Sequence, residues 1–336
     1  MNIAVKVTRA KKVNQVVKMR EKISVVVPCY NEEAVISDFY KAITHVLGLE
    51  MHWDNYEVIF IDDGSNDKTY EIVEKLSKED SHIEYISFSR NFGKESAMYA
   101  GLKYADGEYT VIMDADLQHP PEYIPEMYKL IKTGMYDMVA TRRKSRWGDE
   151  SKLRSFCSEA FYKFMNKISG IDMGNNAMDY RMFNGKAKKA IVDLTEYNRF
   201  SKGIFEWIGF RTFWLEIEIN ERAAGESKWS FGKLLAYSIE GCVAFSTVPL
   251  HLSSLFGIIF CIMAFVMIIV MVVHALLYGI SGTGFATIIC LILLNSGIQL
   301  FCIGILGQYL AKDYLQNKQR PIFIVQNTSK EEIEQI

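Results

Sequence analysis

Two aspartates separated by one residue, Asp114 and Asp116, form the most chemically informative pattern in the sequence. The apolar residues 111–113 before them are typical of a buried strand, and prolines at 120 and 121 exclude a helix directly afterwards. Two carboxylates at the end of a strand can face one pocket, and carboxylate oxygens are preferred ligands of Mg²⁺ and Mn²⁺. The pattern predicts a divalent-ion site that also binds a diphosphate, with a solvated turn as the alternative.

Strands and helices alternate through the first half of the chain. We expect buried strands at about 23–27, 56–61 and 83–87 and before Asp114, separated by helices at about 31–47, capped by Asn31, at 68–78, and up to residue 104. This alternation predicts a parallel, doubly wound α/β sheet, in which ligands bind beyond the carboxyl ends of the strands. Each of the four strands is followed by polar residues, which are Tyr30 and Glu32, Asp62 and Asp63, Arg90 and Lys94, and Asp114 and Asp116.

A basic cluster follows the next predicted strand, at residues 137–141. Its position after a strand end favours a functional role over a solvated charged face. Farther along, residues 174–181 form a turn or a strand start that carries a carboxylate and a guanidinium, and a strand is expected at about 213–220. The charged or hydroxyl residues of this half that we single out are Arg142, Arg143, Lys144, Arg146, Arg154, Ser158, Asp179, Arg181, Arg199 and Lys228.

Charge is distributed very unevenly over the 336 residues, although the net charge is only −2. Nothing global points to nucleic acid as a partner. Residues 241–311 contain no Lys, Arg, Asp or Glu, and the two apolar runs at about 250–278 and 285–310 each exceed the roughly 20 residues that cross a bilayer. The pair predicts a transmembrane helical hairpin, with a buried hairpin of a soluble protein as the alternative.

The segments around this hairpin indicate how the chain is arranged. Residues 231–248 are amphipathic and predict an interfacial helix, or alternatively a helix that packs on the soluble domain. Cationic residues follow the second run, whereas the joint between the runs is uncharged, so the catalytic part and both termini are expected in the cytoplasm. The predicted divisions are a basic tail at 1–21, a catalytic domain at 22–230, the amphipathic helix, the hairpin at 249–311, and a tail at 312–336. The last tail is expected to contain a short strand at 321–325 that joins a sheet edge of this chain or of a neighbouring subunit.

Three sequence segments together resemble the family 2 glycosyltransferases: V-P-C-Y-N-E-E at 27–33, I-D-D-G-S at 61–65 and D-A-D-L-Q-H-P-P at 114–121. More narrowly, the chain is similar to the polyprenyl-phosphate glycosyltransferases, relatives of dolichol-phosphate mannose synthase and of bactoprenol glucosyltransferases. The resemblance extends from about residue 23 to residue 325. It implies a GT-A fold and an inverting transfer of one sugar from a nucleotide sugar to a lipid phosphate.

The resemblance also implies roles for individual residues. It places nucleotide binding at Pro28, Tyr30, Glu32, Asp62, Lys94 and Asp114, and metal binding at Asp114, Asp116 and Gln118. It places catalytic contacts at Asp116, Asp179, Arg181 and Arg199. It places the acceptor phosphate at Arg142, Arg154, Ser158 and Lys228, with Arg143 as the alternative to Arg142.

These implied roles describe a Mg²⁺- or Mn²⁺-dependent enzyme of the plasma membrane. The expected donor is UDP-glucose or UDP-N-acetylglucosamine, the expected acceptor is undecaprenyl phosphate, and the product would serve a cell-surface glycan. A phosphate acceptor is already ionised at neutral pH, so Asp179 is expected to orient groups and to abstract no proton. The resemblance implies a tetramer.

Two other functions compete with this reading. A processive polysaccharide synthase would carry Q-x-x-R-W, but the only Arg-Trp pair, Arg146-Trp147, lacks the glutamine. A non-catalytic nucleotide-sugar sensor in the membrane would bind UDP without transferring a sugar.

Overall fold

The computed structural model describes residues 21–144, 177–219, 243, 246–278 and 284–331. The chain forms two compact units: Met1–Phe164, Ile171–Lys228 and Pro321–Ile336 make the first, and Met165–Gly170 and Trp229–Arg320 make the second. All but the last residue of the predicted tail at 1–21 and most of the predicted interfacial helix at 231–248 lie outside the described residues.

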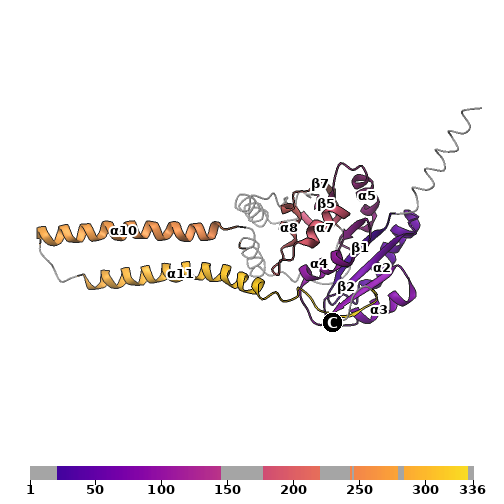
Figure 1. The fold of residues 1–336 in the computed structure, drawn as a ribbon, viewed down its shortest axis with the longest axis horizontal. Helices are drawn as coiled ribbons and strands as arrows, with labels where there is room; N and C mark the ends of the chain where they lie inside the picture. Colours follow the sequence, from indigo (N-terminus) through magenta and orange to yellow (C-terminus); the bar gives the residue numbers. More distant parts are fainter. Residues whose placement is uncertain (1–20, 145–176, 220–242, 244–245, 279–283, 332–336) are drawn as a thin grey trace, which may run out of the picture. The chain divides into compact units, whose positions relative to one another are not determined.

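The first unit is built on an eight-stranded mixed sheet with the order β7-β5-β6-β4-β1-β2-β3-β8. Strands β1, β2, β5 and β7 are labelled in Figure 1. Strands β4, β1, β2 and β3 are mutually parallel, as the sequence predicts. Strand β6 is antiparallel to both β4 and β5, and β8 is antiparallel to β3. The bounds are β1 (Ile23–Cys29), β2 (Tyr56–Asp62), β3 (Ile83–Phe88), β4 (Tyr109–Ile112), β5 (Met138–Arg143), β6 (Ala177–Asn184), β7 (Thr212–Ile217) and β8 (Val325–Thr328).

Helices cover both faces of this sheet because alternate residues of its central strands are apolar on opposite sides. On β1, Val25 and Val27 belong to a buried cluster with Phe39 of α2. On the other face, α4 lies so close that a Cβ at Gly101 would be 2.0 Å from Val26. The helices are α2 (Ile36–Thr44), the π-helical η1 (His45–Glu50), α3 (Thr69–Glu79), α4 (Lys94–Tyr104), the 3₁₀ turn η2 (Pro121–Tyr123), α5 (Ile124–Lys132), α7 (Gly185–Asp193) and α8 (Ser201–Trp207).

The helix predicted at about 31–47 is wrong in two respects, namely the residue at which it begins and its being one continuous α-helix. Helix α2 begins five residues later, its N-cap position is occupied by Val35, and η1 replaces its last turns. Asn31 instead has a positive φ of 54°, and its side-chain oxygen accepts a hydrogen bond from the Asn66 amide at 2.9 Å. Asparagine tolerates this left-handed conformation, so it joins the loop after β1 to the loop after β2 rather than capping a helix.

The strand expected at 321–325 is also misplaced. Strand β8 begins at Val325 and pairs with β3 of the same chain, with Asn327 opposite Ser87. The residues before β8 pack against the end of β3, where the Phe323 ring stacks on Phe88 at 5.0 Å between centroids. One further boundary differs, because Arg142 and Arg143 are strand residues of β5. Of the two alternatives for residues 174–181, the strand start is the one found, since Asp179 and Arg181 lie within β6.

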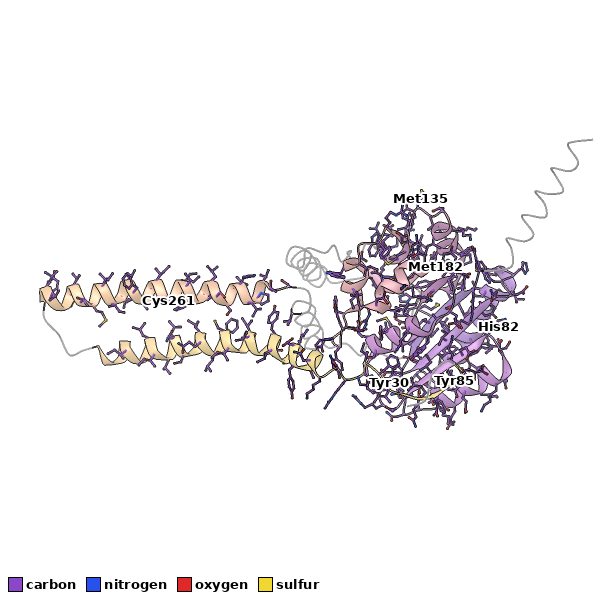
Figure 2. The ribbon with its side chains drawn as sticks, viewed as in Figure 1. Tyr30, His82, Tyr85, Met135, Met182 and Cys261 are labelled. Atoms are coloured by element: carbon purple, nitrogen blue, oxygen red, sulfur yellow. The ribbon has the colours of Figure 1, made fainter. Side chains whose placement is uncertain are left out.

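The second unit contains two long apolar helices, α10 (Val248–Tyr278) and α11 (Phe285–Asn317). Their most apolar windows have mean hydropathies of 3.2 and 1.7, and none of the residues in these windows is buried. Side chains stand outward along both helices, with Cys261 labelled on α10 (Figure 2). By length and composition each helix can cross a membrane, and α11 continues beyond the predicted end at residue 310.

Candidate active site

A pocket of about 500 Å³ lies at the carboxyl ends of β1, β2 and β3. Such edges are where ligands bind in open α/β sheets. Tyr30 follows β1, Asp62 ends β2, and the polar residues 87 and 89–91 come from the end of β3 and the loop after it. The predicted nucleotide-binding residues Tyr30 and Asp62 are thus brought together in one cavity.

Asp62 is held rigidly in the wall of this pocket. Its side chain is buried, its Oδ1 accepts a hydrogen bond from the Ser65 amide at 3.1 Å, and its Oδ2 accepts one from Ser87 Oγ at 2.7 Å. Gly64 allows the loop to pass close to the next one, because its φ is +65° and a Cβ there would be 2.4 Å from the carbonyl carbon of Arg90. Only glycine accepts both conditions without strain.

Asp63, the neighbour of Asp62, has a structural task. It accepts hydrogen bonds from the amides of Phe92 at 2.6 Å and Gly93 at 2.9 Å, which fixes the loop that leads into α4. Burial raises the pKa of Asp63 to about 6 even though these hydrogen bonds act in the opposite direction. The sequence pattern alone does not show that Asp62 lines the pocket whereas Asp63 holds the loop before α4.

Lys94, at the start of α4, joins carboxylates from two strands. Its Nζ lies 2.8 Å from Asp114 Oδ1 and 2.7 Å from Asp179 Oδ2. Burial alone would raise the pKa of Asp179, but the charges of Lys94 and Lys202 outweigh it and hold that pKa well below its usual range. Asp179 is therefore ionised at neutral pH and is a weak base.

The sheet register explains why these carboxylates meet. Ile112 of β4 and Ala140 of β5 both pair with Arg181 of β6, which runs antiparallel between them. Asp114 comes two residues after Ile112, and Asp179 comes two residues before Arg181 on the antiparallel β6. Both aspartates therefore lie toward the same edge of the sheet. The predicted acceptor-phosphate residue Arg142 also follows at this edge, where its Nη2 pairs with Glu216 Oε1 at 2.6 Å.

The residues predicted to bind a metal lie in the turn after β4. The Asp116 carboxylate accepts a hydrogen bond from the Gln118 amide at 3.1 Å, and Leu117 between them has a φ of 56°. Among the described residues there is no group of three or more His, Cys, Asp or Glu that could hold an ion. Mg²⁺ and Mn²⁺ fit this site only as ions shared between one or two carboxylates and substrate phosphates, a mode common for Mg²⁺. The contact of Asp114 with the Lys94 ammonium is consistent with a position that attracts a cation.

His119, in the same turn, is buried and stacks on Tyr180 with ring centroids 5.6 Å apart. Burial lowers the pKa of His119, so its imidazole is neutral at neutral pH. Its Nδ1 has no hydrogen-bond partner among the described residues.

Two of the predicted catalytic residues are held by contacts within the fold. Arg181 is fully buried, and its Nη1 pairs with Glu206 Oε1 of α8 at 2.6 Å. Arg199 donates hydrogen bonds to the carbonyls of Leu194 and Ile191, and its guanidinium lies over the Tyr99 ring at 4.3 Å. Arg181 Nη2 and Arg199 Nε have no hydrogen-bond partner within the described residues, and contact of these two arginines with donor sugar and phosphates stays a prediction.

The remaining predicted residues are only partly placed. Pro28 lies in β1 opposite Ile61 of β2, and the backbone amide of Glu32 donates to Thr69 Oγ1 at 2.8 Å. Arg143 is exposed at the end of β5. Arg154, Ser158 and Lys228 lie outside the described residues.

Sequence reasoning missed several residues that the structure brings to this edge. Glu95 follows Lys94 and accepts a hydrogen bond from the Ser201 amide at 2.8 Å, which ties α4 to α8. Burial raises the pKa of Glu95 to about 6. Gln326 and Asn327 of β8 line the pocket, although nothing in their local sequence marks them. Glu95 was identifiable from its place beside Lys94, whereas the β8 residues depend on pairing between distant segments.

The first unit is a GT-A-like α/β domain with carboxylates clustered beyond β4 and a pocket beyond β1, β2 and β3. The model of the glycosyl transferase family 2 matches residues 24–190. The chain belongs to this family and is a transferase.

Three relatives are similar over almost the whole chain. The putative glycosyltransferase CsbB of Bacillus subtilis is 40% identical over 307 residues, covering 91% of this chain and 92% of the relative. A prophage bactoprenol glucosyl transferase homolog of Escherichia coli is 37% identical, with coverages of 92% and 100%. The bactoprenol glucosyl transferase of Shigella phage SfV is 38% identical, with coverages of 91% and 98%.

A solved structure of glucosyl-3-phosphoglycerate synthase from Mycobacterium tuberculosis is a distant likeness. It has a TM-score of 0.47 and 18% identity, and the match covers 68% of this chain and 79% of that one.

Proposed function

We propose that this chain transfers one sugar from a UDP-sugar, UDP-glucose or UDP-N-acetylglucosamine, to undecaprenyl phosphate. The observation that carries the proposal is the meeting of Asp114 and Asp179 on Lys94 at the sheet edge that also holds the pocket. A donor bound there would have its diphosphate near the carboxylates of the turn after β4 and its nucleoside near Tyr30 and Asp62.

The lipid acceptor rests on two further observations. Two of the relatives are named bactoprenol glucosyl transferase or a homolog of one. This chain also has two helices that can cross a membrane, which suits an enzyme whose acceptor is dissolved in lipid. We propose that the catalytic unit and both termini are cytoplasmic, because the cationic residues after α11 contrast with the uncharged joint at 279–284. We also propose that the chain forms a homo-oligomer.

Charge neutralisation is the main task of the site, because two phosphate-bearing substrates repel one another. Mg²⁺ or Mn²⁺ held by Asp114, Asp116 and Gln118 would stabilise the negative charge that develops on the leaving diphosphate. Arg142 with its neighbouring residues would bind the acceptor phosphate, because guanidinium forks suit phosphate oxygens. These residues are Arg143, Arg154, Ser158 and Lys228.

In this proposal Asp179 orients a substrate and takes part in no proton transfer. The acceptor phosphate is already ionised, so its oxygen can attack the sugar carbon while the bond from that carbon to the diphosphate breaks. No proton needs to be removed. Asp179, ionised and tied to Lys94, would orient the donor sugar.

The direct test is incubation of the full chain with radiolabelled UDP-glucose or UDP-N-acetylglucosamine, Mn²⁺ and undecaprenyl phosphate. We expect one sugar on a lipid that extracts into organic solvent, loss of product with a chelator, and recovery with Mg²⁺ or Mn²⁺. Asp116→Asn should abolish the product, whereas the matched control Asp38→Asn, on the exposed side of α2, should not. A polymer would indicate a processive synthase, and nucleotide binding without product would indicate a sensor.

A further inference from the structure

Two residues with side-chain amides line the pocket from a segment more than 200 residues away in sequence. Gln326 and Asn327 belong to β8 and line the same cavity as Tyr30 and Asp62. Within the described part of the chain, neither amide group has a hydrogen-bond partner. Each amide therefore keeps its donor and its acceptor available for a ligand.

The register of β8 explains the direction of Asn327. It lies opposite Ser87 in the antiparallel pair, and residues directly opposite each other point to the same face of a sheet. Ser87 faces the pocket, where its hydroxyl donates to Asp62. The side chain of Asn327 is therefore placed next to the part of the wall that Asp62 and Ser87 form.

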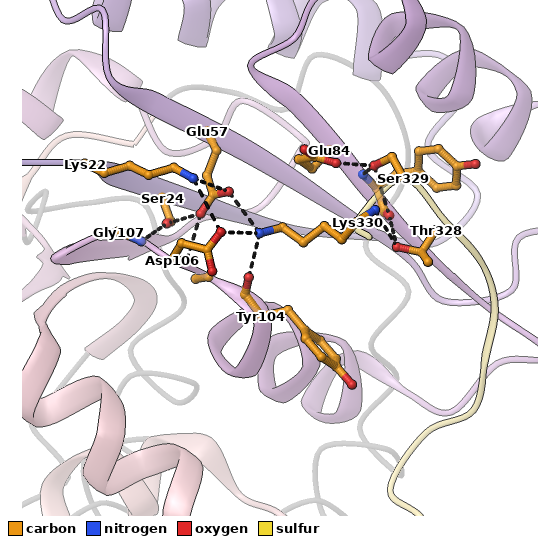
Figure 3. A network of polar contacts seen from close by, with 12 residues as sticks. Lys22, Ser24, Glu57, Glu84, Tyr104, Asp106, Gly107, Thr328, Ser329 and Lys330 are labelled. Carbon is orange, nitrogen blue, oxygen red and sulfur yellow. Dashed lines mark hydrogen bonds and ion pairs between the residues drawn. The ribbon is translucent and has the colours of Figure 1, made fainter. Parts of the chain in front are cut away.

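Contacts on both sides hold β8 in place. On the preceding side, Phe323 stacks on Phe88, and the Ser89 amide donates to the Ile324 carbonyl at 3.0 Å. On the following side, the Lys330 Nζ lies 3.0 Å from Glu57 and 3.0 Å from Asp106 (Figure 3). A strand anchored at both ends can present its amides in a fixed position, as a binding site requires.

The position of β8 in the sheet indicates which part of a donor it meets. Strand β8 lies beyond β3, whereas the carboxylates Asp114 and Asp116 follow β4 at the other end of the parallel set β4-β1-β2-β3. A diphosphate near those carboxylates leaves the nucleoside end of the ligand toward β8. Neutral amides suit that end, because a pyrimidine base presents carbonyl acceptors and an N–H donor in one plane.

We propose that Gln326 and Asn327 bind the nucleoside of the donor, so that the segment after α11 completes the nucleotide pocket of the catalytic unit. This inference rests on the proposed function, since it takes the ligand of the pocket to be a nucleotide sugar. The last strand of the chain is then part of the substrate site and not only a tail.

The experiment measures UMP binding to the full chain in detergent, without metal, by titration calorimetry. UMP retains the nucleoside but lacks the diphosphate, so the measurement is independent of the Asp114 and Asp116 site. We expect Gln326→Ala and Asn327→Ala each to weaken UMP binding by about three- to tenfold, the effect of one lost neutral hydrogen bond. The matched control is Asn55→Ala, an exposed asparagine before the opposite end of β2.

Thermal unfolding of each variant shows whether β8 is still folded, and Asn327→Asp, which keeps the shape but removes the N–H donors, should also weaken binding. Wild-type affinity for UMP in the double alanine variant would overturn the inference, and so would an equal loss in Asn55→Ala. If the unmodified chain binds GMP instead, the proposed UDP donor is wrong, and the same variants measured with GMP decide the inference. Failure to bind either nucleotide would overturn both proposals.

Discussion

Replacement of Lys330 by methionine tests how strongly the segment after α11 is held by the catalytic unit. The Lys330 ammonium lies 3.0 Å from Glu57, 3.0 Å from Asp106 and 2.8 Å from the Tyr104 carbonyl. The side chains of Lys330 and Glu57 are only 8% and 4% exposed, so solvent screens their contact little. Lys330→Met keeps much of the apolar stem but leaves the Glu57 carboxylate with one cation fewer.

The expected loss in the free energy of unfolding is about 2–3 kcal/mol. Removing one partner of a buried ion pair typically costs about 3–5 kcal/mol, because the remaining charge stays buried. The lower value applies here because Lys22 also pairs with Glu57, at 2.9 Å. Hydrogen bonds from Ser24 and from the Asp106 amide satisfy the other carboxylate oxygen.

The assay is urea unfolding of the full chain in detergent, followed by tryptophan fluorescence. Trp53 reports on the catalytic unit, because its indole donates to the Glu21 carbonyl at 3.0 Å. The matched control is Lys75→Met on α3, where the lysine side chain is 75% exposed and a change below about 0.5 kcal/mol is expected.

A double-mutant cycle isolates the Lys330–Glu57 contact. Glu57→Gln removes the charge from the second partner, and we expect a coupling energy of about 1.5–3 kcal/mol, the range of charged hydrogen bonds. The reasoning is refuted if Lys330→Met destabilises no more than Lys75→Met, or if the two changes are additive.

The same contact predicts a dependence on pH. Burial by itself raises the pKa of Glu57, but hydrogen bonds from Ser24, Asp106 and Lys22 and the charge of Lys330 outweigh it, and the net pKa is lowered. Because the folded pKa is below the usual 4.5, this stability is present above pH 4.5 and is lost as the pH falls through the folded pKa. Lys330→Met should flatten this acid limb of the unfolding curve.

Three further predictions concern the site. The pKa of Asp63 is raised from 3.8 to about 6 in the folded state, so its protonated form stabilises the fold fully below pH 3.8, and this stability is lost as the pH rises through 6. In the unmodified chain the free energy of unfolding should therefore fall by about 3 kcal/mol over this range, and urea unfolding should show that Asp63→Asn removes the fall. Gly64→Ala should lower the unfolding free energy by about 1–3 kcal/mol and weaken UMP binding, because the position has a φ of +65° and no room for a Cβ; an unchanged melting temperature would contradict this. Lys94→Met should reduce sugar transfer by at least about 100-fold with an unchanged circular dichroism spectrum, because Asp114 and Asp179 lose their shared cation; wild-type activity would remove Lys94 from the site.

Local pattern was sufficient for the elements that position the site. Strand β1 ends within two residues of its predicted limit, and β2 and β3 each end within one, because their apolar runs are bounded by clear polar signals. The helix expected at Asn31 failed because the asparagine bonds to the neighbouring loop at Asn66, and that loop cannot be seen from the local sequence. The role of Arg181 near the donor sugar was implied by the family resemblance and stays a prediction; that its guanidinium is buried in β6 and paired with Glu206 of α8 could be seen only in the tertiary structure.

The sequence alone determined the elements of the fold, since a run of apolar residues, a change of periodicity and the spacing of acids are local properties of the chain. From them follow the alternating strands and helices, the polar strand ends and the two long apolar helices. Membership of the glycosyltransferase family follows from the resemblance carried by the segments 27–33, 61–65 and 114–121 and from the family match. Only the tertiary structure decided which polar residues meet. Register across β6 brings Asp179 to Asp114, and pairing of β8 with β3 carries Asn327 to the pocket. Such meetings depend on contacts between distant segments, whose cost in chain entropy is repaid only when the whole sheet forms, and no local pattern encodes them.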